Sequence, residues 1–251
     1  MLPAEFLPTS RVAFVRGEPI PASDAQEAAV AAHWRTALER NPSLFNGALV
    51  SPLGACVHDG VCTVRWHRSD FAHYLFSRQN PDRPVIGATG TLFVSIIVPT
   101  TDGELILGRM SQQTSAPSVI QLPGGGVSVG PDQTQISHSD LTAVAVQETS
   151  EELGITLDPA GLRTRGVIKR HSPPDIGVVF STEPRARDSI QAAFAALRLR
   201  DLLAGIVSEF DELFAVSPRT DLRSLSGRGD HVIDYLPVVV GAFLTTGGGI
   251  V

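Results

Sequence analysis

Three glutamates near the middle of the chain have the types and spacing of a metal site. Glu151 and Glu152 stand three and four residues after Glu148, in a segment at 140–153 whose pattern predicts a helix that ends at Gly154. Carboxylates at these intervals share one side of a helix, and near its negative end they disfavour the isolated helix. A divalent cation would offset that repulsion, and carboxylate oxygens are the ligands that Mg²⁺ and Mn²⁺ prefer. The segment therefore predicts a Mg²⁺ or Mn²⁺ site, with a solvated helix face as the alternative.

A glycine triplet precedes this helix. An apolar run at 119–122 leads into Pro123 and then into Gly124, Gly125 and Gly126. Backbone without side chains can pass close to a ligand or to a helix, which is how main-chain amides surround a phosphate. The spacing does not fit the GxGxxG pattern of a dinucleotide-binding fold. We therefore expect the triplet to bind substrate, with a flexible turn as the alternative.

Together the two segments resemble the signature of the Nudix hydrolases. The residues that carry the resemblance are the PGGG turn and the stretch QETSEELGI at 147–155. Matched position by position, Glu148, Glu151 and Glu152 take the places of the family's helix glutamates. The resemblance covers roughly residues 85–245 and implies a Nudix-type α/β/α sandwich. It also implies a divalent metal that holds a pyrophosphate-linked substrate and activates water.

Several features depart from the general family pattern. Gln147 replaces an arginine, Thr149 replaces an apolar residue, and the loop at 127–146 is lengthened, so that the first-half glutamate has no counterpart and Asp132 is the nearest acid. A divergent subgroup that cleaves UDP-glucose and UDP-galactose is similar in its glutamine, its long loop and an Asn-Pro-x-Leu-Phe-x-Gly-Ala segment, here residues 41–48. This similarity implies a UDP-sugar substrate, cleaved to UMP and a sugar 1-phosphate.

Two other function classes stay open. One is a Nudix hydrolase of another diphosphate, such as a nucleoside triphosphate, ADP-ribose, coenzyme A or a prenyl diphosphate. The other is a catalytically inactive Nudix domain that binds a nucleotide or a partner, which the changes at Gln147 and Thr149 motivate. Magnesium-dependent product formation separates the two classes.

A later strand offers further carboxylates. Glu209, Asp211 and Glu212 begin a predicted strand at 209–216, and Nudix proteins often supply an additional ligand or base from such a place. Among these residues Glu212 is the catalytic candidate, although each of them is also a plausible surface acid. The proton of the attacking water is expected to pass to Glu151 or to a carboxylate of this strand.

Basic residues flank the strands that should face the substrate. Arg109, Lys169, Arg170 and His171 are in position to contact phosphate or uracil, and arginine can bind phosphate through two parallel hydrogen bonds. Arg109 and Arg170 are the substrate-binding candidates. A role in surface solubility is the alternative for each.

Local patterns predict an N-terminal extension at 1–84. Residues 23–40 have the pattern of a helix capped by Ser23, and residues 55–66 predict a hairpin that turns at Asp59-Gly60. Ser69 is the expected cap of a short helix that ends near residue 76. A polar, proline-containing stretch at 77–84 then marks the expected domain boundary.

The second unit, residues 85–251, alternates strands and helices. Its predicted strands are 91–98, 104–108, 119–122, 164–169, 177–182 and 209–216, and its predicted helices are 140–153, capped by Ser137 or Ser139, and 188–203. A core element followed by a frayed tail is expected at 235–251. The alternation predicts an α/β fold with a mixed sheet.

Composition narrows the function further. The 251 residues are 43% hydrophobic and 18% charged, so the chain should fold, and its net charge of −6 gives no reason to expect nucleic-acid binding. No tract is apolar enough to predict a membrane span or a secretory signal. Two cysteines support neither a disulfide framework nor a zinc site. We therefore expect a cytoplasmic protein that acts on a small diphosphate. A homodimer remains possible.

Overall fold

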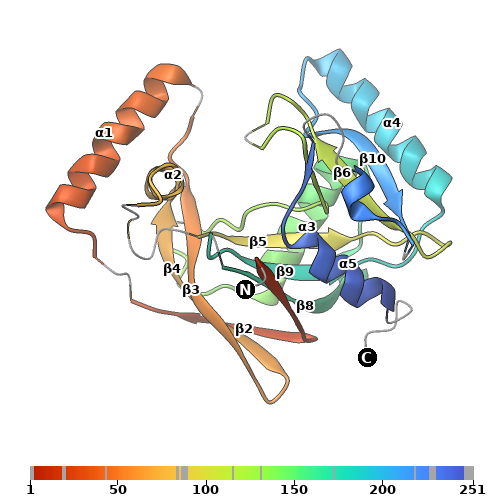
Figure 1. Cartoon of the computed structure of the whole chain (residues 1–251), viewed down its shortest axis with the longest axis horizontal. Helices are drawn as coiled ribbons and strands as arrows, with labels where there is room; N and C mark the ends of the chain where they lie inside the picture. The colour runs from red at the N-terminus through yellow and green to blue at the C-terminus, as the bar shows by residue number, and fades with distance from the viewer. Residues whose placement is uncertain are drawn as a thin grey trace.

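The computed structural model describes residues 3–18, 21–42, 44–82, 85, 90–114, 116–130, 132–171, 173–217, 219–225 and 230–245. Within these ranges the chain forms five α-helices and three β-sheets (Figure 1). The α/β class with mixed sheets, expected from the sequence, is confirmed.

A four-stranded mixed sheet lies at the centre of the larger unit. In order, its strands are β1 (Ala4–Pro8), β8 (Arg163–Arg170), β9 (Ile176–Ser181) and β5 (Leu92–Ile97). The β5–β9 pair is parallel and the other two pairs are antiparallel. Successive residues of a strand face opposite sides of a sheet. Thus Val94 and Ile96 join one hydrophobic core, whereas Ile97 joins a second.

Helices cover both of these cores. On one side pack α3 (His138–Leu153) and α4 (Arg187–Ala204), and on the other packs α5 (Leu236–Thr245). A second sheet completes the larger unit, with strands in the order β10 (Phe210–Val216), β6 (Leu105–Met110), β7 (Val119–Gln121) and β11 (His231–Val232). The elements expected for this unit are present, with ends that differ from prediction by at most two residues.

The N-terminal module is the group of elements at the left of Figure 1. It contains the three-stranded sheet β2 (Arg11–Arg16), β4 (Val61–Asp70) and β3 (Ala48–His58), and the helices α1 (Asp24–Arg40) and α2 (Phe71–Gln79). Ser23 caps α1, and Asp59 and Gly60 form the hairpin turn with φ of 50° and 71°, as predicted. The cap of α2 is Asp70 rather than Ser69, because the Asp70 side chain accepts from the amide of His73.

The sequence patterns did not predict strands β1 and β2. β1 pairs with β8 of the larger unit, and β2 pairs with β4 of the N-terminal module. Both partners are distant along the chain, so no local pattern indicates these strands. The start of the chain therefore contributes to sheets on both sides of the boundary expected at 77–84, where residues 83 and 84 lie outside the described residues.

Two short 3₁₀ helices, Pro159–Gly161 and Leu222–Leu225, complete the described elements. The tail expected after α5, residues 246–251, lies outside the described residues. None of the described helices combines the length and apolar character that a membrane crossing requires.

Candidate metal and phosphate site

Helix α3 is held firmly at both ends. The Ser137 side chain accepts from the amide of Asp140, and the Asp140 side chain accepts in return from the Ser137 amide. At the other end Gly154 has a left-handed φ of 71°, and a Cβ there would lie 2.6 Å from the Ala193 carbonyl oxygen of α4. No basic residue stands in the last turn to balance its glutamates. The helix thus presents uncompensated carboxylates from a rigid support.

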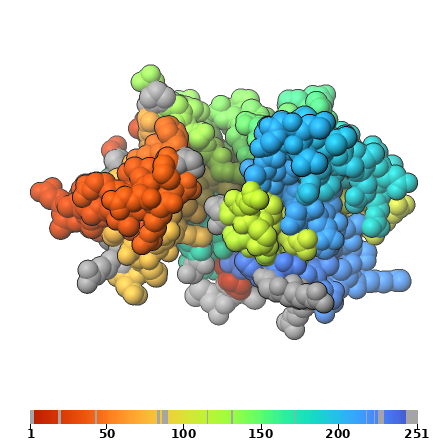
Figure 2. Space-filling model, turned by 90° about the horizontal axis from the view of Figure 1, so that it is seen from above, coloured from red at the N-terminus to blue at the C-terminus, as the bar shows by residue number. Residues whose placement is uncertain are grey.

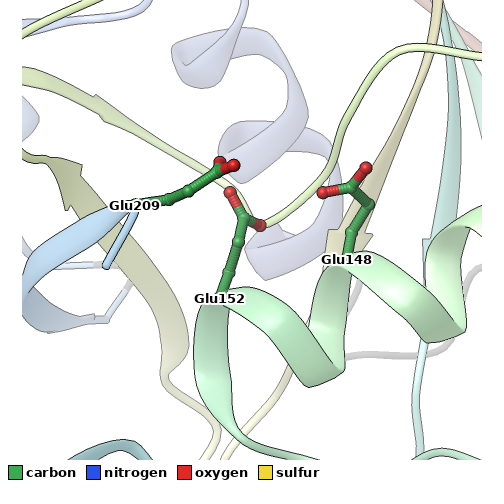
Figure 3. Close-up of side chains that lie close together, drawn as sticks. All are labelled: Glu148, Glu152 and Glu209. Carbon is green, nitrogen blue, oxygen red and sulfur yellow. The ribbon is translucent and has the colours of Figure 1, made fainter. Parts of the chain in front are cut away.

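Two glutamates of α3 meet a third from another part of the chain. Glu148 and Glu152 point toward Glu209, which precedes β10 (Figure 3). One carboxylate oxygen from each of the three lies within 4.8 Å of the others. Glu209 is held beside the end of β6, because its carbonyl oxygen accepts at 2.7 Å from the amide of Ser111, the residue after that strand. This arrangement can surround one small cation.

Glu152 is the most deeply placed member of the cluster. It is 1% exposed, and its Oε2 accepts a hydrogen bond of 2.7 Å from the Gly124 amide. Its Oε1 is buried without a hydrogen-bond partner among the described residues. Burial raises the pKa of Glu152 well above its usual range, and the charges of Glu148 and Glu209 raise it further, against the opposing hydrogen bond from Gly124.

The other two glutamates experience the same shortage of positive charge. Burial, followed by the charges of Glu209 and Glu151, raises the pKa of Glu148 to about 7. Burial and the charge of Glu151 also raise the pKa of Glu209. Across the described ranges, no arginine, lysine or histidine forms an ion pair with Glu148, Glu152 or Glu209. A cation bound between the carboxylates would supply the missing charge.

Two of the three consecutive glycines are needed for close approach. The turn runs beside β5, where the amides of Val94 and Ile96 donate to the carbonyl oxygens of Gly125 and Pro123. A Cβ on Gly124 would lie 2.1 Å from the Val94 carbonyl oxygen, and one on Gly125 would lie 2.1 Å from Oε1 of Glu148.

A Cβ on Gly126 would meet nothing within 4 Å. Gly124 and Gly125 therefore bring backbone against the carboxylate cluster, whereas a side chain at Gly126 would have open space.

The loop between α4 and Glu209 is fixed by a hydrogen bond to a buried side chain. Asp201, near the end of α4, is 3% exposed, and its Oδ2 accepts from the Ser208 hydroxyl at 2.9 Å. Gly205 ends α4 with a left-handed φ of 68°. The residue before Glu209 is therefore tied to a buried carboxylate.

Of the acids at the start of the 209–216 strand, the structure brings Glu209, and not Glu212, next to Glu148 and Glu152. Alternation along a regular strand puts residues three apart on opposite faces, but it does not say which of the two faces α3, and a register shift between Phe210 and Glu212 interrupts the pairing of β10 with β6. The position of Glu209 could have indicated its role, because it is the first residue of the predicted strand, where a side chain can turn away from the sheet.

Glu212 and Arg109 instead belong to a separate ion-pair group. Arg109 Nε lies 2.8 Å from Asp211 Oδ1, its Nη2 lies 3.0 Å from Glu212 Oε2, and its Nη1 lies 3.4 Å from Asp230 Oδ2. The Asp211 hydrogen bond is the main cause of the raised pKa of Arg109. The guanidinium expected to contact substrate is thus surrounded by protein carboxylates.

Arg170 is likewise engaged by the protein. Its side chain is 14% exposed, pairs with Asp234 at 2.8 Å and also binds the buried Asp175. The neighbouring Lys169 stands opposite Glu5 in the β1–β8 ladder. His171 lines a groove of about 710 Å³ between β1 and α5. The structure does not bring these residues into the glutamate cluster.

Gln147 and Thr149, the two helix positions that depart from the family pattern, both form hydrogen bonds within α3. The side-chain Nε2 of Gln147 donates to Oε1 of Glu151 at 3.0 Å, so this residue orients a neighbouring glutamate. Thr149 is fully buried, and its hydroxyl donates to the Ala145 carbonyl oxygen at 2.7 Å. Glu151 itself is exposed and lies outside the three-carboxylate cluster.

No protein-family model and no curated protein matches this chain. Among solved structures, the chain is similar to the one described as "Solution structure of the E. coli ORF135 protein", with 16% identity over 65% of this chain and 94% of that chain. The TM-score of the pair is 0.32.

Proposed function

We propose that this protein is a Nudix-type, metal-dependent hydrolase that cleaves the diphosphate of a small molecule. The observation that carries the proposal is the convergence of Glu148, Glu152 and Glu209 within 4.8 Å, next to the backbone of Gly124 and Gly125. A diphosphate needs positive charge on its oxygens, which an ion held by these carboxylates would supply, and it needs room close to the backbone, which the two glycines allow.

The donor set fits magnesium or manganese. All three groups are carboxylates, and Glu152 keeps a buried oxygen without a partner among the described residues. Burial, together with the charges of neighbouring glutamates, raises the pKa of each carboxyl. Glu148, Glu152 and Glu209 would hold the ion, with Glu151 on the exposed side of the helix. When bound, the ion would neutralise diphosphate oxygens and lower the pKa of a coordinated water.

The chain's own residues would position the reactants. The Gly124 amide donates to the buried Glu152 carboxylate, and the side chain of Gln147 donates to the exposed Glu151 carboxylate, so each has one hydrogen bond that orients it. Glu151 is exposed and accepts one hydrogen bond at Oε1 from the described side chains, so in this proposal it would accept the proton of the attacking water.

The proposed substrate is a nucleoside diphosphate linked to a sugar, with UDP-glucose or UDP-galactose first. Its support is the joint occurrence of Gln147, the long 127–146 loop and the 41–48 segment in separate parts of the chain. A site that hydrogen-bonds uracil would reject adenine strongly, because its buried polar groups would be left unpaired. We place this activity in the cytoplasm, where the free thiols of Cys56 and Cys62 stay reduced.

The first test is a screen of diphosphate compounds with the full chain, with and without Mg²⁺, followed by phosphorus NMR. Hydrolysis that requires Mg²⁺ or Mn²⁺ and stops after EDTA treatment supports the proposal. Turnover that persists unchanged after EDTA and dialysis contradicts it. Metal binding without turnover of any compound would identify a binding domain instead.

Substrate identity needs a separate competition. With equal concentrations of UDP-glucose and ADP-ribose, we expect UMP and glucose 1-phosphate to appear first. Faster loss of ADP-ribose would refute the UDP-sugar assignment and leave the diphosphatase standing.

A further inference from the structure

Helix α4 has two apolar faces, and the fold buries only one of them. The buried face carries Ile190, Phe194 and Leu197. The opposite face, at 100° per residue, carries large side chains that are 50–80% exposed: Leu199, Leu202 and Leu203 of the helix, and Ile206 and Val207 directly after it. Large apolar side chains scattered singly on a surface need no explanation, but a continuous group marks an interaction site.

The same exposed stripe continues toward the start of α4 with small residues. Ala192, Ala195 and Ala196 are exposed and precede Leu199 and Leu203 at intervals of three and four residues. This spacing is that of a seam between two packed helices. The stripe therefore has a small half, followed by a large half.

Charged neighbours of the stripe are held by their own chain. Arg198 donates to the Phe210 carbonyl oxygen at 3.0 Å, and Arg200 donates to Asp201 Oδ1 at 2.9 Å. The eight residues of the stripe are uncharged, and at 100° per residue the charged side chains between Ala192 and Val207 lie to either side of it or on the buried face. Figures 1 and 2 show α4 along the outer edge of the molecule, where a second helix can approach it.

We propose that two copies of this chain associate through antiparallel packing of α4 about a two-fold axis. In that arrangement the leucine half of each stripe lies on the alanine half of the other, so large side chains fill the space that small ones leave. A parallel pair would instead place leucine on leucine at one end and leave a gap between alanines at the other. Antiparallel helix dipoles also oppose each other favourably.

A membrane surface is the less suitable occupant. Helices that lie in a bilayer surface combine large or aromatic apolar residues with many basic ones. Three of the eight residues of this stripe are alanine, the stripe has no aromatic residue, and the chain carries a net charge of −6. The alanines have a clear use only against another helix, because they allow close approach.

The oligomeric state tests the proposal without reference to activity. Sedimentation velocity and light scattering should give the intact protein twice its 26.7 kDa chain mass at micromolar concentration. Ala196→Arg and Leu203→Arg should each raise the dissociation constant at least about 100-fold, because the two-fold axis places each charge in the interface twice. Ala31→Arg, the same change at an exposed position of α1, should leave the dimer intact. Circular dichroism checks that every variant is folded.

Cross-linking tests the orientation. In a Cys56→Ser background, Ala192→Cys and Leu203→Cys proteins should be joined by a short bismaleimide only when the two are mixed. Efficient cross-linking of each variant with itself would show a parallel pair and overturn the proposal. So would a wild-type monomer at 200 µM, a dimer that survives both arginine variants, or a monomer that floats with phosphatidylcholine vesicles.

Discussion

Two glutamates only three residues apart have different surroundings in this protein. Glu209 faces Glu148 and Glu152, whereas Glu212 is paired with Arg109 at 3.0 Å. The first is short of positive charge and the second already has it. For these two residues, the neighbouring charged groups decide which carboxylate is available to a cation.

The first prediction uses this pair as variant and matched control. Glu209→Gln should weaken Mn²⁺ binding at least about tenfold, because one of three carboxylates that share the ion is lost. Glu212→Gln should change it less than about twofold, since Arg109 keeps Asp211 and Asp230. Titration calorimetry measures both, and an equal effect of the two substitutions would contradict the site.

The second prediction concerns the glycine turn. Gly125→Ala should lower kcat about 100-fold and weaken Mn²⁺ binding, because the added Cβ would lie 2.1 Å from Glu148 Oε1 and must displace that carboxylate. Gly126→Ala, one residue later, has open space and should keep at least half of the activity. Steady-state kinetics on the best substrate decides the matter, and near-equal activities of the two variants would indicate a merely flexible turn.

At the scale of elements, helices α1 and α2 are joined by one charged group. His73 of α2 directs Nδ1 to Asp70 at 2.9 Å and Nε2 to Glu27 of α1 at 3.1 Å. Both partners are carboxylates, which only accept, so both ring nitrogens donate and the ring is charged. The Asp70 hydrogen bond is the main reason why the pKa of His73 is raised to about 9.

The third prediction follows from this shift. Because the folded-state pKa is higher than the usual 6.5, the stabilisation is complete below about pH 6.5 and is lost as pH rises through about 9. The difference in Tm between wild type and His73→Ala should therefore be largest at pH 6 and shrink by pH 10. His58→Ala is the control, because the His58–Asp59 pair is almost fully exposed and should matter little at any pH. A difference that does not change with pH would exclude the ionic account.

At the scale of the whole molecule, one buried ion-pair network joins parts of the chain that are far apart. Asp175 accepts from the Thr91 amide at 3.0 Å, binds Arg170 and lies 3.4 Å from Arg78 of α2, while Arg170 also binds Asp234. The network thus links the N-terminal module, the start of β5, the end of β8 and the segment before α5. Its position indicates a structural task for Arg170.

The fourth prediction separates that task from substrate binding. Arg170→Ala should lower the free energy of unfolding by about 3–5 kcal/mol, because it removes the Arg170 charge that the buried Asp175 carboxylate is paired with. Arg163→Ala on the same strand should cost at most about 1 kcal/mol, since its pair with Glu183 is exposed. Denaturant titration compares the two variants. An Arg170→Ala protein of wild-type stability with a raised KM would restore the substrate-binding role.

Sequence alone was sufficient where the determining interactions are local. The cap of α1 at Ser23, the end of α3 at Gly154 and the hairpin turn at Asp59-Gly60 each depend on residues within a few positions of one another. The cap of α3 stayed open between Ser137 and Ser139, and the structure shows Ser137. Helical spacing likewise placed Glu148 and Glu152 on one side of α3 before any tertiary contact was known.

Tertiary structure decided which distant groups meet those residues. Glu209 joins the cluster, while Arg109 and Arg170 are taken up by protein carboxylates, and β1 enters the central sheet beside β8. These outcomes depend on strand pairing across large sequence separations and on a register shift in β10 that alternation cannot reveal. The helix therefore specified two carboxylates of the candidate site, and only the folded chain could supply the third.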